Sequence, residues 1–301
     1  MRSFQSASSA RSGDPVSGVR ASVRRIGAAC ALGLSALAGG AQAADLSAAQ
    51  PVPQAPAAPS DLYIVRLTAN LQAEPRFPGS KELTLLGYPS IGIRRADEPE
   101  RFSAPDDGLS FSFLDTPSLR IGAVGRYRSG RYYGDDRRDL FGLRDVKWSV
   151  EPGAFVEVWP VAWLRARAEV RYGFNGYEGV VGNLGLDVVQ SVGRFTFSLG
   201  PRLAFGDSGF TNAFFSVTPF EAALNGRVTP FRAHGGLTSA GVLGAVTYKW
   251  SEQWATTAYA GYDRLTGDAA DSPITRRLGS RDQFTLGASV SYSFATTAFW
   301  R

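Results

Sequence analysis

Residues 164–172 read LRARAEVRY. Apolar side chains alternate with charged ones along the whole stretch: Leu164, Ala166, Ala168, Val170 and Tyr172 against Arg165, Arg167, Glu169 and Arg171. A period of two is the side-chain period of a β-strand. In a water-soluble sheet the apolar face would pack on a core and the charged face would meet water. In a transmembrane barrel the apolar face would meet lipid and the charged face the lumen.

The same alternation recurs along the chain, for example in QFTLGASVSYSF (283–294) and LRIGAVGRYR (119–128). It predicts twelve strands, at 61–71, 82–94, 107–115, 117–129, 146–158, 161–174, 179–191, 193–206, 210–218, 234–250, 252–265 and 282–294. Many are long enough to cross a bilayer at a tilt. Apart from one turn at 221–226, no segment has a helical pattern. We therefore expect an all-β protein, an antiparallel transmembrane β-barrel of about twelve strands, with ten as the alternative.

The N-terminal region has the three parts of a secretory signal peptide, namely a basic stretch, a short apolar run and an A-x-A site. We expect a signal peptide over 1–43, with cleavage between Ala43 and Ala44. An Ala/Pro-rich linker over 44–60 follows, and the barrel forms a single domain over 61–301. The leader holds five Arg and one Asp, so most of the chain's net charge of +5 leaves with it. The basic balance therefore gives no reason to expect a nucleic-acid partner.

Tryptophan is confined to predicted strand ends and turns, as in WPVAW (159–163) and WSEQW (250–254). Interfacial aromatic girdles of barrels lie at such positions. One feature conflicts with twelve strands. If both termini lie at the periplasmic end, WSEQW falls at that end, whereas WPVAW and the SVG turn (191–193) fall at the other. This mismatch indicates a count that is wrong by one strand, around 206–235.

The strand register also predicts which charges enter the lumen. Nine are basic and four acidic, so not all can pair: Arg120, Arg126, Arg128, Lys147, Arg165, Arg167, Arg171, Arg194 and Arg202 against Glu151, Glu157, Glu169 and Asp187. A water-filled lumen of this kind favours anions. If the lumen is instead closed, an Arg–carboxylate network plugs it. Barrels of about eight strands are filled by side chains and those of sixteen or more hold a channel, so twelve leaves both alternatives open.

Catalytic and metal chemistry have little support in the sequence. His234 is the chain's one histidine, and the one cysteine lies in the leader, so no transition-metal site or cofactor is expected. Ser239 lies five residues after His234, an odd offset that places two strand residues on opposite faces. We therefore expect no enzyme activity.

Several stretches resemble the MipA/OmpV family of outer-membrane proteins: EPRFPGS (74–80), LFGLRDV (140–146), GPRLAF (200–205), AFFSVTPFEA (213–222), GGLTSAG (235–241), YDRLTGDAADSPI (262–274) and SYSF (291–294). The resemblance implies a barrel in the outer membrane of a Gram-negative bacterium. One member of that family is a scaffold that links a lytic transglycosylase to a penicillin-binding protein, and others resemble porins or adhesins. We expect a scaffold linked to peptidoglycan remodelling, with an anion-preferring, porin-like channel or a surface adhesin as alternatives.

Overall fold

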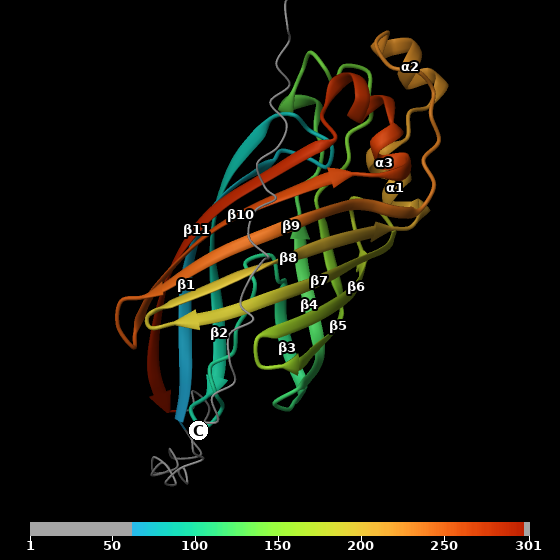
Figure 1. Ribbon diagram of the computed structural model, residues 1–301. Helices are drawn as coiled ribbons and strands as arrows, with labels where there is room; N and C mark the ends of the chain where they lie inside the picture. The colour runs from blue at the N-terminus through green and yellow to red at the C-terminus, as the bar shows by residue number, and fades with distance from the viewer. Residues whose placement is uncertain (1–61, 298–301) are drawn as a thin grey trace, which may run out of the picture. The chain divides into compact units, whose positions relative to one another are not determined.

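The computed structural model describes residues 62–297, so the predicted signal peptide (1–43) and linker (44–60) lie outside the described residues. The described chain forms one antiparallel sheet that curls into a barrel (Figure 1). Its eleven strands are β1 (Leu62–Pro75), β2 (Leu83–Arg95), β3 (Leu109–Asp115), β4 (Leu119–Arg128), β5 (Ser149–Val161), β6 (Leu164–Gly173), β7 (Gly179–Val192), β8 (Phe195–Gly206), β9 (Gly236–Lys249), β10 (Trp254–Leu265) and β11 (Asp282–Thr297).

Short helices interrupt the connections at one end of the barrel: a 3₁₀ turn η1 (Tyr133–Asp135), α1 (Ser208–Phe215), α2 (Pro219–Asn225), α3 (Gly267–Asp271) and a π turn η2 (Ile274–Leu278). None of the described helices is long and apolar enough to cross a membrane.

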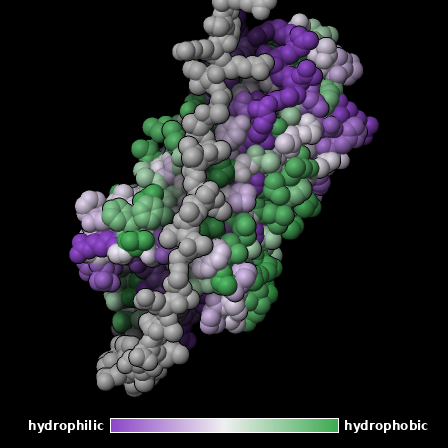
Figure 2. Space-filling model, viewed as in Figure 1, coloured by the Kyte–Doolittle hydropathy of each residue, from purple (hydrophilic) through white to green (hydrophobic). Residues whose placement is uncertain are grey.

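Strand β6 shows why the sheet closes with its charges inside. Arg165, Arg167, Glu169 and Arg171 are between 1% and 6% exposed, whereas Val170 on the opposite face is 59% exposed. This is the reverse of a soluble sheet, in which the exposed face is the polar one. Figure 2 shows hydrophobic side chains over the outer surface of the strands and hydrophilic ones around the helical end. The sheet therefore presents its apolar face to lipid, which confirms the predicted transmembrane barrel.

The strand count is eleven and not twelve, because the predicted strand 210–218 is mostly helix α1. Asp207 caps this helix by accepting a hydrogen bond from Phe210 N. Phe210 and Phe214, four residues apart, then face the same apolar cluster. The expectation of no helix was likewise wrong at α2, where Thr218 and Glu221 form a capping box and Gly226 ends the helix at φ +70°. The predicted single turn at 221–226 falls within this helix.

Without a strand at 210–218, the short turns lie at one end of the barrel and the long connections at the other. In the sheet the strands lie in the order β2-β1-β11-β10-β9-β8-β7-β6-β5-β4-β3, and each runs antiparallel to its neighbours. Four short turns therefore lie at the same end of the barrel as Leu62 and Thr297. We call this the turn end; its turns cover residues 116–118, 162–163, 193–194 and 250–253. The long connections all lie at the other end. WPVAW and WSEQW thus lie at the same end, which removes the conflict between them. The segment wrongly counted as a strand lies within 206–235, as expected.

The sheet is not closed by hydrogen bonds between β2 and β3, which are its two edges. Alternation around the sheet makes these edge strands run in the same direction, both toward the turn end. The chain must therefore return along the length of the barrel between them. Residues 96–108, ADEPERFSAPDDG, make this return, and we call them the strap.

The connections opposite the turn end pack into a cap. One apolar cluster joins α1 and α3 to Tyr177 of the β6–β7 connection and Val181 of β7. A second joins Phe77 from the β1–β2 connection to Leu140, Ala222 and Ile274 from three other connections. Most of the stretches that resemble the MipA/OmpV family contribute to this cap. These stretches, which are separate in the sequence, thus lie together at one end of the barrel.

Only some of the tryptophans lie exposed at the two ends of the barrel, where an aromatic girdle was expected. Trp163, Trp250 and Trp254 are at least 47% exposed at the turn end, where Trp254 packs on Tyr292 with ring centroids 4.8 Å apart. Trp148 is exposed at the cap end. Trp159, however, shares the inner face with Glu157, to which its indole N–H donates at 3.0 Å. Trp300 lies outside the described residues.

Candidate functional site

The inner wall formed by β4 to β8 carries a connected set of ion pairs. The strand register brings together eleven of the predicted lumen charges: Arg120, Arg126, Arg128, Glu151, Glu157, Arg165, Arg167, Glu169, Arg171, Asp187 and Arg202. Their side chains project from adjacent strands into the same space because paired residues of neighbouring strands share a face. We call this set the arginine wall.

Two predicted lumen charges do not join it. Lys147 precedes β5, outside the sheet, and is exposed. Arg194 lies in the turn before β8, where its guanidinium donates to the backbone carbonyl of Trp250. Both were placed in the lumen by extending strand alternation past the ends of the strands.

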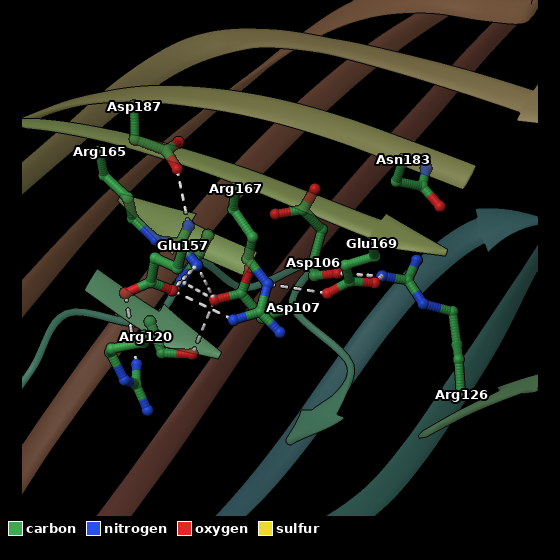
Figure 3. Close-up of polar contacts among 12 residues, drawn as sticks. Asp106, Asp107, Arg120, Arg126, Glu157, Arg165, Arg167, Glu169, Asn183 and Asp187 are labelled. Atoms are coloured by element: carbon green, nitrogen blue, oxygen red, sulfur yellow. Dashed lines mark hydrogen bonds and ion pairs between the residues drawn. The ribbon is translucent and has the colours of Figure 1, made fainter. Parts of the chain in front are cut away.

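Arg165 is at the centre of the arginine wall. Its guanidinium lies 2.9 Å from Glu157 and 2.8 Å from Asp187, and all three side chains are at most 1% exposed. A third carboxylate, that of Asp107, accepts from Arg165 Nη2 at 2.6 Å. Figure 3 shows these side chains meeting from different elements. Because buried charges are costly unless they are paired, the carboxylates around Arg165 are needed to keep it inside.

The neighbouring arginines are held in the same way. Arg167 donates to Glu157 at 3.1 Å and to Glu169 at 2.9 Å, and its guanidinium stands 3.9 Å from the centre of the Phe155 ring. Arg171 donates to Glu151 at 3.1 Å and to Asn183 at 2.6 Å. Each guanidinium thus bridges carboxylates of different strands, which fixes the inner wall as a rigid network.

The strap lies inside the barrel, against the arginine wall. Asp106 pairs with Arg202 at 2.7 Å, and Asp107 pairs with Arg165. At its other end Glu100 pairs with Arg66 of β1 and with Lys249 of β9 at 2.5 Å. Arg66 of β1 and Arg165 of β6 lie far apart in the strand order, whereas Lys249 of β9 and Arg202 of β8 are on neighbouring strands, so the strap reaches across the lumen.

Aromatic contacts add to this anchoring. The Phe102 ring packs edge-on against Trp159, with centroids 6.4 Å apart, and the Arg165 guanidinium lies 5.5 Å from its centre. The tryptophan expected in an interfacial girdle therefore helps to hold the strap.

Asp106 and Asp107 are the site residues that the sequence did not reveal. Asp107 was assigned to the start of the predicted strand 107–115, and Asp106 to the connection before it. A usable signal was present: the mismatch of turn lengths requires two neighbouring strands to run in the same direction. Two adjacent acids next to Pro105 in the segment that joins those strands are then candidates for balancing the surplus arginines.

A cavity of about 20 Å³ lies among Asp107, Arg167, Arg202 and Asn183, close to the volume needed for one water molecule. Arg167 Nη2, which is buried, has no hydrogen-bond partner among the described residues. The strap therefore occupies this part of the lumen without satisfying every donor of the wall.

His234 lies on the cap and away from the arginine wall. Its ring Nδ1 is 2.9 Å from Asp268 Oδ2, which also accepts from the His234 backbone N–H. That backbone bond, followed by the contact with the ring, lowers the pKa of Asp268. The pair borders a surface pocket of about 360 Å³ lined by Thr211, Thr266 and three glycines. Among residues 62–297 no His234–Ser239 hydrogen bond forms, and no cluster of three metal-ligating side chains occurs.

Comparison with solved structures shows similarity to bacterial outer-membrane proteins. The KdgM porin shares 12% identity over 77% of this chain and 99% of its own, with a TM-score of 0.34. A bacterial polysaccharide outer membrane secretin shares 7% identity over 79% of this chain and 100% of its own, with a TM-score of 0.37. OmpT of Vibrio cholerae, folded in vitro, shares 10% identity over 77% of this chain and 97% of its own, with a TM-score of 0.33.

Comparison with curated protein sequences gave no match. Residues 67–294, which include all but the outermost residues of the barrel, match the family described as MltA-interacting protein MipA. The predicted family resemblance is confirmed, as is the location that it implied. The chain belongs to the MipA family of outer-membrane β-barrel proteins.

Proposed function

We propose that this protein anchors peptidoglycan-remodelling enzymes, a lytic transglycosylase and a penicillin-binding synthase, to the inner surface of the outer membrane. The family name, MltA-interacting protein, supports a partner of this class. The observation that carries the proposal is the strap, which crosses the lumen and binds the arginine wall through Asp106 and Asp107. A barrel whose lumen is occupied is better suited to hold a partner than to pass a solute.

The turn end provides the surface that such a partner would use. Both ends of the described chain, Leu62 and Thr297, lie there. The turn end carries exposed charges of both signs: Arg194 and Glu252 in its turns, Arg95 at the end of β2 and Asp97 at the start of the strap. Short turns on a rigid sheet lose little conformational entropy on binding, so they favour a specific complex.

A surface adhesin is the second candidate, because the cap exposes apolar side chains. Phe220 and Leu224, one helical turn apart on α2, are 72% and 47% exposed. Exposed apolar groups on a cap facing the exterior are a recognised basis for attachment to another surface.

The anchor proposal is tested by equilibrium binding between a purified lytic transglycosylase and residues 44–301 refolded in lipid nanodiscs. We expect saturable binding that falls at least tenfold in the variant Arg194→Glu with Glu252→Arg, which reverses charges at the turn end. Arg232→Glu, a matched reversal of an exposed charge on the cap, should leave the affinity unchanged. Absence of binding, or weakening only by Arg232→Glu, would refute the anchor.

A further inference from the structure

We propose that the strap is an internal plug and that the arginine wall behind it is an anion pathway, so that the barrel conducts small anions when the strap leaves the lumen. This inference goes beyond the anchor function: it concerns what the strap and the arginine wall do inside the lumen, whereas partner binding is assigned to the turn end. It is carried by the charge balance of the wall, by the way in which the strap is held, and by donors that the strap leaves free.

The charge balance of the arginine wall depends on the strap. Strands β4 to β8 contribute seven arginines and four carboxylates to the ion pairs of the wall. Of the three missing negative charges, Asp115 of β3 supplies one beside Arg120, and Asp106 and Asp107 supply the other two where Arg165, Arg167 and Arg202 converge. The carboxylates of Asp106 and Asp107 thus stand where a mobile anion would be bound. With the strap removed, the wall keeps an uncompensated positive charge that attracts anions and repels cations.

The strap is held by side chains and not by the sheet. Ala96 N donates to Leu62 O at the start of the strap, but the other backbone pairs given for the strap, Glu98 to Arg95 and Asp107 to Ala104, are local turns. Pro99 and Pro105 lack the N–H that a ladder requires. The strap can therefore move without breaking any pairing among the eleven strands, while Arg95 and Leu109 on either side of it stay paired with Tyr63 and Gly125.

Unused donors show that the wall is not specialised for the strap alone. Arg167, whose buried Nη2 has no hydrogen-bond partner among the described residues, lines the cavity of about 20 Å³. The cavity is also lined by Arg126, Arg165 and Arg202. Buried guanidinium groups normally use all their donors, so a free one beside three other arginines marks a place where an anion gains bonds that the strap does not make.

The proposal is tested in planar bilayers by cutting the strap after folding. A protease site inserted between Asp97 and Glu98, which are exposed at the turn end, allows the refolded barrel to be cut. We expect the uncut protein to be silent and the cut protein to give stable current steps. In a KCl gradient the reversal potential should lie toward the chloride equilibrium potential. Adding Arg167→Gln and Arg202→Gln to the cut protein should shift it toward that of potassium.

The matched control carries the same protease site between Ser251 and Glu252, in another turn at the same end, and should stay silent when cut. Asp106→Asn with Asp107→Asn, left uncut, is the second test, because weaker anchoring should give brief anion-selective openings without any cut. The proposal is overturned if the cut protein, shown by heat-modifiable migration to be folded, is silent, conducts no better than the uncut protein, or prefers cations. Silence would leave the anchor function untouched, since partner binding is measured separately.

Discussion

Asp107 of the strap accepts a hydrogen bond from Arg165 of β6 at 2.6 Å, across 58 residues of sequence and across the interior of the barrel. The contact joins the one segment that returns through the lumen to the centre of the arginine wall. The strap can make this contact because β2 and β3 run in the same direction, so that the chain between them runs along the length of the barrel. The order of strands in the sheet thus determines which carboxylate reaches the wall.

Removal of this carboxylate should destabilise the barrel. Asp107→Asn leaves Arg165 and Arg167 with less compensating charge in a buried setting, and breaking a buried pair costs about 3–5 kcal/mol. Urea unfolding of the refolded protein, followed by tryptophan fluorescence, measures the change. Asp97→Asn is the matched control, because its pair with Arg95 is exposed to solvent and should contribute little to stability. Equal effects of the two substitutions would show that Asp107 is not a structural partner of the wall.

The cap should lose stability in acid through Asp139. Burial alone would raise the pKa of Asp139, but hydrogen bonds and charge from Lys81 and Arg227 outweigh it and hold the pKa below 3.8. A lowered pKa stabilises the fold above the unfolded value, and the benefit is lost as pH falls through the folded pKa.

The check is a pH series of melting temperatures for the wild type and Asp139→Asn. The difference in melting temperature between the two proteins should have its full value near neutral pH. It should disappear in acid, below the ordinary pKa of an aspartate. A difference that stays constant down to the most acidic pH would exclude a role for the ionised carboxylate.

Much of the barrel could be predicted from the sequence, because lipid imposes strict alternation on every crossing strand. LRARAEVRY shows this most clearly, since a slip of one residue would place four charges in lipid. The stretch 210–218 was misread because FTNAFFSVT supports both periods, and only Asp207 as a cap and the capping box at Thr218 separate them. The strap was missed for a different reason: Asp106 and Asp107 have no local pattern, and their partners follow from strand direction around the whole sheet.

The orientation of the barrel can be tested by thiol labelling of intact cells. If the turn end faces the periplasm, Gln253→Cys in the β9–β10 turn should react with a bulky, membrane-impermeant maleimide only after the outer membrane is disrupted. Phe220→Cys, on the exposed face of α2, should react in intact cells. The only natural cysteine, Cys30, lies in the predicted leader, so background labelling of the mature chain should be absent. The reverse pattern would place the cap in the periplasm and would remove the turn end as the partner surface.

The outer face of β6 offers the sharpest test that the barrel spans lipid. Val170 is 59% exposed in the protein alone, between two inward residues, Glu169 and Arg171, that are almost fully buried. Val170→Arg should cost about 2–4 kcal/mol in a bilayer if the residue lies near the midplane, because the guanidinium cannot be solvated there. Val170→Leu, the control, should change little. Folding titrations into lipid vesicles measure both variants. In a soluble sheet an arginine at this exposed position would be neutral, so a negligible effect of Val170→Arg would contradict the assignment of this face to lipid.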